Sequence, residues 1–165
     1  MNNILETERL FIEPLSKTDS KFILELLNTE GWIKFIGDRN VHNEADAQNY
    51  IQRILDNRNC DYSVFRLKEN KNPLGIITFI KRDNQQFPDI GFAMLPAYEK
   101  KGFAYEAARK YMDEIVKNGQ HKNIIGITVS DNWKSISLLE KLGLTFKEKF
   151  IEKSDELSVY ALTLL

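Results

Sequence analysis

The stretch "DIGFAMLPAYEKKGFAYEAARKYMDEIVKNGQHKNIIGITVS", residues 89–130, predicts how the centre of this chain folds. It begins with an apolar run at 89–95, continues with apolar residues at helical spacing from about Ala104 to Val116, and ends with a β-branched run at 123–130. A strand, a helix and a second strand in this order form a crossover that makes the two strands run parallel. The sequence therefore predicts a βαβ unit with a ligand site at the carboxyl ends of its strands.

The turn into the predicted helix is bare and basic, because it reads Lys100-Lys101-Gly102. A glycine can adopt backbone angles closed to other residues, and it leaves the first amides of the helix open to a ligand. We expect that ligand to be an anion. An ordinary strand-to-helix turn with two solvated lysines is the alternative that the segment by itself leaves open.

The rest of the chain reads as further strands and helices of one α/β domain spanning residues 1–165. Alternating or continuous apolar runs predict strands, and apolar residues at helical spacing predict helices. The predicted strands are 8–15, 62–67, 74–82, 145–153 and 157–164. The predicted helices are 19–29, 43–55 with Asn43 as its N-cap, and 132–143 with Gly143 as its stop, and residues 30–42 are predicted to form a loop. This order predicts one mixed sheet, mostly antiparallel, with helices on its faces.

Composition excludes several classes of function. A net charge of −1 in 165 residues provides no excess of lysine and arginine for binding nucleic acid or a membrane surface. A single cysteine, Cys60, excludes an internal disulfide, and the wide separation of His42 and His121 argues against a histidine metal centre, so we expect no metal. The N-terminus lacks the pattern of a secretory signal, and no apolar run approaches transmembrane length. We expect a cytoplasmic protein.

Two motifs on either side of the crossover resemble those of the GNAT superfamily of N-acetyltransferases, within it the Rim-type branch that acetylates ribosomal proteins. The first is the pyrophosphate loop, here Glu99-Lys100-Lys101-Gly102-Phe103-Ala104, and the second is Asn132, Ser135, Leu139 and Gly143 at the spacing Asn-x-x-Ser-x-x-x-Leu-x-x-x-Gly. The resemblance covers nearly the whole chain. It implies a GNAT fold and direct acetyl transfer from acetyl-CoA, the cosubstrate, to an amine.

The resemblance also implies which residues hold the coenzyme. Backbone amides of the loop and of the first helical turn would bind its pyrophosphate, because a helix N-terminus offers unpaired donors and a partial positive charge. The family's oxyanion donor is a backbone amide of the strand that matches "GFAML". The implied coenzyme-binding residues are Met94, Leu95, Lys100, Lys101, Gly102, Phe103, Ala104, Tyr105 and Asn132. Glu99 departs from the family's usual Gln or Arg, and the two lysines would supply the local countercharge.

Three further residues are implied to serve the chemistry. Asn132 would orient the pantetheine arm or the amine and also cap a helix. Ser135 would donate its hydroxyl proton to the leaving thiolate. Asp89 occupies the position where Rim-type members often carry an acid, which makes it the first candidate for the general base, and Glu44 is the second. A purely structural aspartate beside a turn is the alternative interpretation of Asp89.

The acceptor is set by the segment 30–47, for which few rules transfer between proteins. We expect acceptor contacts from its acids and its tryptophan, namely Glu30, Trp32, Asp38 and Glu44. The acceptor itself is open between a protein N-terminal α-amine and a small-molecule amine such as a polyamine or an aminoglycoside. A non-catalytic acyl-CoA-binding module is the rival from another class, and the protein would act as a monomer or a homodimer.

Overall fold

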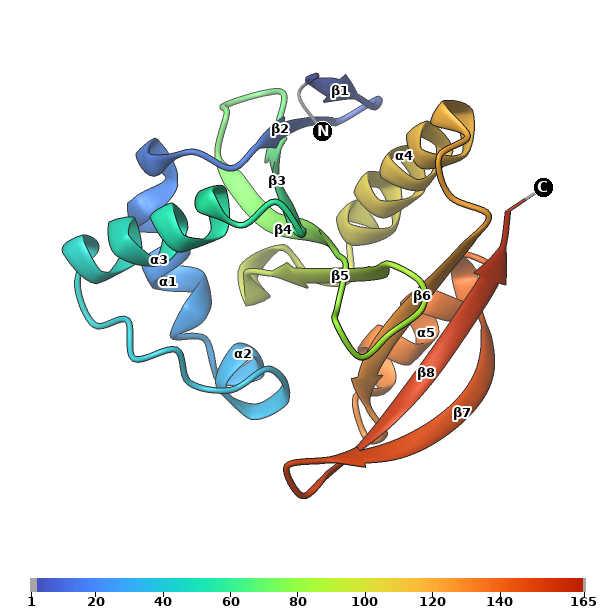
Figure 1. The fold of residues 1–165 in the computed structure, drawn as a ribbon. Helices are drawn as coiled ribbons and strands as arrows, with labels where there is room; N and C mark the ends of the chain where they lie inside the picture. Colours follow the sequence, from blue (N-terminus) through green and yellow to red (C-terminus); the bar gives the residue numbers. More distant parts are fainter. Residues whose placement is uncertain (1–2, 165) are drawn as a thin grey trace.

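The computed structural model describes residues 3–164, and its helices and strands follow the order expected from the sequence (Figure 1). The first half comprises β1 (Leu5–Glu6), β2 (Leu10–Pro14), the short 3-10 helix η1 (Lys17–Asp19), α1 (Ser20–Leu27), α2 (Glu30–Phe35), α3 (Glu44–Asp56), β3 (Cys60–Leu67) and β4 (Pro73–Ile80). The second half comprises β5 (Asp89–Met94), the 3-10 helix η2 (Pro96–Tyr98), α4 (Phe103–Asn118), β6 (Asn123–Val129), α5 (Trp133–Lys141), β7 (Thr145–Glu152) and β8 (Asp155–Thr163).

Within the described residues, eight strands form one sheet in the order β1-β2-β3-β4-β5-β6-β8-β7. Its neighbouring strands are antiparallel except for β5 and β6, which run parallel as the two ends of the crossover through α4. The predicted mixed, mostly antiparallel sheet with a parallel βαβ unit is therefore confirmed.

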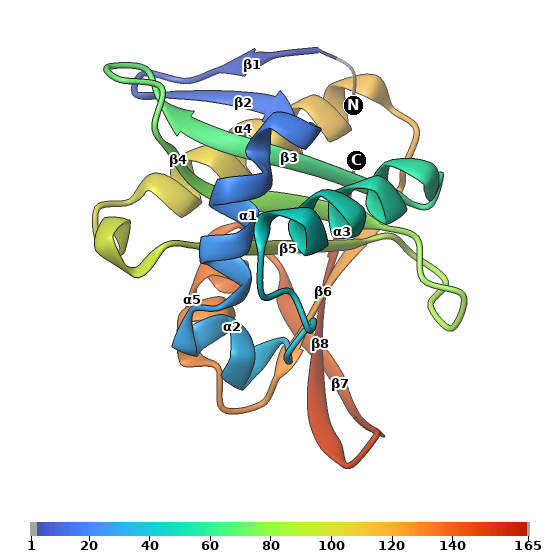
Figure 2. The ribbon, with the colours of Figure 1, turned by 90° about the vertical axis from the view of Figure 1, so that its left-hand side faces the viewer.

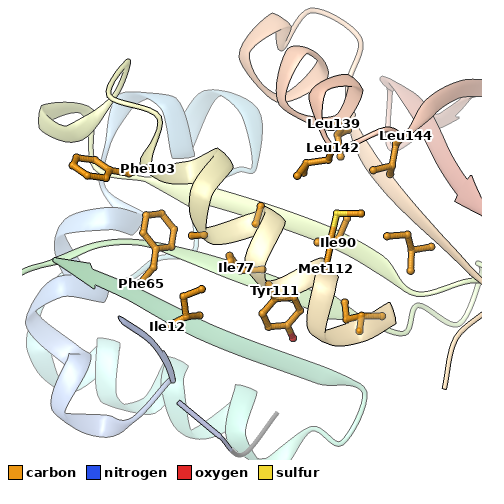
Figure 3. Packing of buried hydrophobic residues seen from close by; sticks show 14 of the residues in the cluster. Ile12, Phe65, Ile77, Ile90, Phe103, Tyr111, Met112, Leu139, Leu142 and Leu144 are labelled. Carbon is orange, nitrogen blue, oxygen red and sulfur yellow. The ribbon is translucent and has the colours of Figure 1, made fainter. Parts of the chain in front are cut away.

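Helices cover both faces of this sheet. Helices α1, α2 and α3 lie on one face, and α4 and α5 lie on the other (Figures 1 and 2). Each face has its own apolar cluster. Tyr111, Met112 and Leu139 belong to the cluster under α4 and α5 (Figure 3), whereas Ile23, Ile51 and Val64 belong to the cluster under α1 and α3.

The helix ends follow local sequence signals. The Asn43 side chain accepts a hydrogen bond from the N–H of Asp46 at 2.9 Å, which confirms it as the N-cap of α3. Gly119 ends α4 with φ of 63°, and Gly143 follows α5 with φ of 95°, both in the left-handed region that favours glycine. None of the helices within residues 3–164 is long and apolar enough to cross a membrane.

Two predictions about local structure were wrong. The expected loop at 30–42 contains α2, whose start is capped by the Thr29 side chain accepting from the N–H of Trp32 at 3.3 Å. The burial of Trp32, which is 5% exposed, stabilises this short helix beyond what its sequence indicates. The run at 123–130 was expected to be buried on both faces, but only its first half is: Ile124 and Ile125 are buried, and residues 127–130 are half-buried.

Candidate active site

The parallel strands β5 and β6 separate after a single pair of residues, Asp89 and Ile125. Beyond that pair, residues 91–94 of β5 and 127–129 of β6 are half-buried, although both strands lie in the middle of the sheet. Central strands normally bury their residues under the helices on both faces. We call the stretch where these two strands no longer pair the β5–β6 gap.

The backbone of β5 directs alternate residues toward this gap. The carbonyl of Pro88 accepts from the N–H of Ile125 in β6 at 2.9 Å, whereas the N–H of Leu95 donates to a carbonyl of β4 at 2.8 Å. Because backbone groups alternate sides along a strand, the N–H and C=O groups of Phe92 and Met94 point toward β6. Because β6 no longer pairs with β5 here, these groups are open to a ligand. The Leu95 amide is not open, since it already donates to a carbonyl of β4.

The loop that follows β5 brings a helix N-terminus to the end of the gap. Lys100 and Gly102 have φ of 61° and 80°, and Gly102 is the N-cap of α4. The first helical hydrogen bond runs from the N–H of Glu106 to the carbonyl of Gly102 at 3.0 Å, so the N–H groups from Phe103 to Tyr105 precede it and have no helical acceptor. The predicted anion-binding amides are thus grouped at one place. The side chain of Phe103 is buried in the core, so only its amide faces outward.

The second motif lies on the other side of the gap, at the start of α5. The Asn132 side chain accepts from the N–H of Ser135 at 3.3 Å and donates to the Ser135 Oγ at 3.0 Å. Asn132 is therefore the N-cap of α5, as predicted. Because the Ser135 hydroxyl accepts this bond, its own proton remains available for a further acceptor.

An ion pair joins the two sides. The Nζ of Lys134 in α5 lies 2.5 Å from the Oε2 of Glu99, in the loop between η2 and α4. The structure therefore brings together the loop, the end of β5 and the start of α5. Glu99, which departs from the family motif, has its charge balanced by Lys134.

Asp89 lies apart from this group of residues. It sits at the start of β5 and is 3% exposed, and its carboxylate accepts from the N–H of Ile127 at 3.1 Å and from the Nε of Arg82 at 2.7 Å. Burial raises the pKa of this carboxyl to about 6, against the opposing effects of Arg82 and of the Ile127 amide. Met94 is five positions after Asp89 along β5, a distance of about 17 Å in an extended strand. The geometry thus places Asp89 out of direct reach of a group bound at Met94.

The residues predicted to contact the acceptor lie around α2 and the start of α3. Glu30 begins α2 and is exposed. Asp38 accepts from the N–H of Asn40 at 2.7 Å, and Glu44 accepts from the Ser20 hydroxyl at 2.8 Å. Trp32 is buried, and its Nε1 donates to no acceptor within residues 3–164. These residues belong to α2, to α3 and to the loop between them. Both helices lie on the face of the sheet opposite to α4 and α5 (Figures 1 and 2).

Two groups of polar residues escaped the sequence analysis. Tyr50 in α3 and Tyr62 in β3 are joined by a hydrogen bond between their side chains, Tyr50 also bonds to Arg39, and burial raises the pKa of both phenols. The second group is Arg9 with Glu106, which are 97 positions apart. Residues that meet only in the folded chain cannot be recognised from local spacing. Tyr62 is a partial exception, because it lies two positions before Val64 in β3 and its hydroxyl therefore falls on the face that packs against the core.

Comparisons with known proteins agree with this arrangement. The model of the acetyltransferase (GNAT) domain matches residues 9–145. An uncharacterized N-acetyltransferase of Bacillus subtilis (strain 168), YnaD, is 26% identical over 155 residues, covering 92% of this chain and 90% of the relative. A GNAT-family acetyltransferase from Bacillus anthracis has a similar crystal structure, with a TM-score of 0.83 and 23% identity over 98% of each chain. RimL, a ribosomal L7/L12 α-N-protein acetyltransferase in complex with coenzyme A, matches with a TM-score of 0.84 and 11% identity over 98% of each chain.

The domain match spans most of the chain, and it includes both the loop at the start of α4 and the cap at the start of α5. The similarity in fold to the Bacillus anthracis acetyltransferase extends over 98% of each chain. This chain belongs to the GNAT family of acetyltransferases.

Proposed function

We propose that the protein transfers an acetyl group from acetyl-CoA directly to a primary amine, and that its preferred acceptor is the α-amine of a protein or peptide. The observation that carries this proposal is the β5–β6 gap, which opens beside the unpaired amides at the start of α4. A coenzyme with a diphosphate and an amide-containing arm needs these two kinds of partner, namely several grouped donors and an open strand edge. The binding of coenzyme A by RimL, which shares the fold, supports the proposal.

The residues present suit such a coenzyme. The N–H groups of Phe103 to Tyr105 have no helical acceptor, and Gly102 carries no side chain that would cover them. The partial positive charge of the helix N-terminus favours an anion there by about 0.3–1 kcal/mol per contact. Lys100 and Lys101 are both exposed and add positive charge at the same turn.

Acetyl-CoA supplies the thioester: the amine nitrogen bonds to its carbonyl carbon, the carbon–sulfur bond breaks, and the proton lost by the amine is balanced by the one that the sulfur gains. In this scheme the Met94 amide donates to the carbonyl oxygen as negative charge develops on it. The Ser135 hydroxyl donates a proton toward the sulfur, and the Asn132 amide holds that hydroxyl in place at 3.0 Å. Helices α4 and α5 occupy one face of the sheet, so the amine enters from the face of α1 to α3 (Figure 2).

The α-amine is the acceptor that needs the least help from a base. Its pKa is about 7.7–8.0, against about 10.4 for a lysine side chain, so at neutral pH about one α-amine in six is neutral against about one lysine amine in a few thousand. Asp89, the first candidate base, is buried and already paired with Arg82. An amine that is neutral before it binds is therefore the better substrate.

A cationic small molecule such as a polyamine is the second candidate acceptor. It is favoured by the acids of the 38–46 segment, since the carboxylates of Asp38, Glu44 and Asp46 accept hydrogen bonds from backbone N–H groups and a hydroxyl, which are neutral donors. Such charges would attract a polycation more strongly than a peptide with a single amine.

The test is thiol release from acetyl-CoA with matched acceptors between pH 6.5 and 9. One peptide carries only a free N-terminus, a second only a free lysine side chain, and spermidine is the third acceptor. We expect the highest kcat/KM for the first peptide at neutral pH. A preference for the lysine peptide would contradict the α-amine assignment, and no release with any amine would overturn acetyl transfer itself.

A further inference from the structure

Glu106, in the first turn of α4, joins this helix to the N-terminal segment of the chain. Its Oε1 accepts from the backbone N–H of Arg9 at 3.0 Å and from the Thr7 hydroxyl at 2.5 Å. Its Oε2 accepts from the Arg9 Nε at 2.7 Å and lies 2.6 Å from the Arg9 Nη2. Burial acts to raise the pKa of Glu106, but these hydrogen bonds from Thr7 and Arg9 hold it below its ordinary value. The carboxylate therefore stays charged and holds the arginine by a two-pronged contact.

Arg9 in turn reaches the loop in front of α4. Its Nη1 donates to the carbonyl oxygen of Lys101 at 3.1 Å, and its guanidinium lies over the Phe103 ring, 4.3 Å from the ring centre. Arginine is suited to this task because its planar group presents donors in fixed directions. Arg9, Glu106 and the Lys101 carbonyl thus form a connected unit, which we call the Arg9 clamp.

The clamp determines which way one peptide group of the loop faces. In a trans peptide the C=O and the following N–H point in opposite directions. With the Lys101 carbonyl held toward Arg9, the Gly102 N–H points away from Arg9. Arg9 approaches from the side of β2, whereas β6 lies on the other side of β5 in the strand order. The Gly102 amide therefore points away from the side of β2, on which Arg9 lies.

We propose that Arg9 is a positioning residue for the coenzyme: it orients the 101–102 peptide so that the Gly102 amide donates to the diphosphate, without contacting the coenzyme itself. This inference rests on the proposed function, because it requires that the loop binds coenzyme A. The charge of Arg9 is balanced by Glu106, so it acts through the loop backbone.

Substitutions at Glu106 and Arg9 separate this role from a direct charge effect. If electrostatics alone mattered, Glu106→Gln would strengthen coenzyme binding, because it removes a negative charge beside an anion. The clamp requires the opposite, since Arg9 then loses its anchor. Arg9→Lys keeps the positive charge but loses the planar guanidinium that bonds to Glu106 and to the Lys101 carbonyl at the same time. A direct contact between residue 9 and phosphate would survive this change, whereas the Arg9 clamp would not.

The first experiment measures the dissociation constant of coenzyme A by calorimetry for the unchanged protein, Arg9→Lys and Glu106→Gln. The second measures the activity of the same proteins with acetyl-pantetheine, an acetyl donor that lacks the diphosphate. The control is Lys68→Met, which removes the ion pair with Glu6 at 3.0 Å in the same N-terminal region but touches no loop residue. We expect the Kd of coenzyme A to rise about tenfold in both clamp variants. The kcat/KM of the two clamp variants for acetyl-pantetheine should equal that of the unchanged protein. The Kd of coenzyme A for the control Lys68→Met should also stay unchanged.

Unchanged or tighter coenzyme binding in Glu106→Gln, or retained affinity in Arg9→Lys, overturns the clamp while the proposed function stands. An equal loss with acetyl-pantetheine also overturns it, because the defect would then be a general loss of structure. Failure of the unchanged protein to bind coenzyme A overturns the proposed function and this inference with it.

Discussion

The carboxylate of Asp89 in β5 accepts a hydrogen bond from the backbone N–H of Ile127 in β6 at 3.1 Å. By the alternation along β5, the carbonyl of Ile90 would be the acceptor for that N–H if the parallel ladder continued. A side chain thus takes the place of the next backbone partner, at the point where the two strands separate. We therefore expect Asp89 to end the ladder and to help keep the β5–β6 gap open.

Asp89→Asn and Asp89→Val should therefore differ in activity. Asparagine retains an oxygen that can accept from Ile127, so we expect kcat/KM to fall by only a few-fold. Valine offers no acceptor and frees the Ile127 amide to pair with β5, so coenzyme binding should weaken strongly. Steady-state kinetics and coenzyme titration measure both effects. A loss of 10²–10⁴-fold in kcat with Asp89→Asn, the range typical of a missing general base, would instead support the role that the family resemblance implies.

The same carboxyl makes the stability of the protein depend on pH. Its pKa of about 6 in the folded chain lies above the ordinary value of 3.8, so the native state binds the proton more tightly than the unfolded state does. This contribution to stability is fully present below about pH 4 and is lost as the pH rises through 6. The difference in unfolding free energy between the unchanged protein and Asp89→Asn, measured by urea denaturation, should fall by roughly 2–3 kcal/mol between pH 4 and 7. A difference that is constant or that rises with pH would contradict this assignment.

Gly102→Val should remove the stabilisation that acetyl-CoA confers. With coenzyme at 100 times its Kd, the unchanged protein should melt about 5–10 °C higher. Valine at a φ of 80° strains the turn, and its Cβ would lie 3.5 Å from the Arg9 Nη2, so the side chain also disturbs the contact that holds this loop. Gly119→Val is the matched control, because Gly119 has φ of 63° at the opposite end of the same helix, with open space around it. Both variants should lose intrinsic stability, but a thermal shift that persists in Gly102→Val would overturn the loop as the binding site.

Ser135→Ala should lower kcat by about tenfold or more and change the Kd of coenzyme A little, since the proton donor matters only as the thiolate leaves. The N-cap survives this change, because Asn132 accepts from the backbone N–H of residue 135. Ser137→Ala, an exposed serine of the same helix, is the control for α5 itself. Equal kcat values for Ser135→Ala and the unchanged protein would leave Ser135 as a structural residue of the cap.

Signals that act within a few residues were readable in the sequence. The helical spacing of α4, the stop at Gly143 after α5, the N-cap Asn43 and the order strand-helix-strand all depend on local backbone preferences, and the structure confirms them. Helix α2 was missed because its six residues have no amphipathic repeat and include Gly31, so it depends on the burial of Trp32. The two-residue strand β1 is too short for any pattern to indicate it.

The sequence by itself determined the class of fold and the two motifs of the candidate site, because the turn at Gly102 and the cap at Asn132 are built from residues that are close along the chain. Tertiary structure alone decided that Asp89 is buried and paired with Arg82, that Arg9 reaches the Lys101 carbonyl, and that Lys134 meets Glu99. Each of these contacts depends on burial or on how separate elements pack around the sheet. Local spacing carries no information about either, since the energy of a contact depends on distance in space and not on distance along the chain.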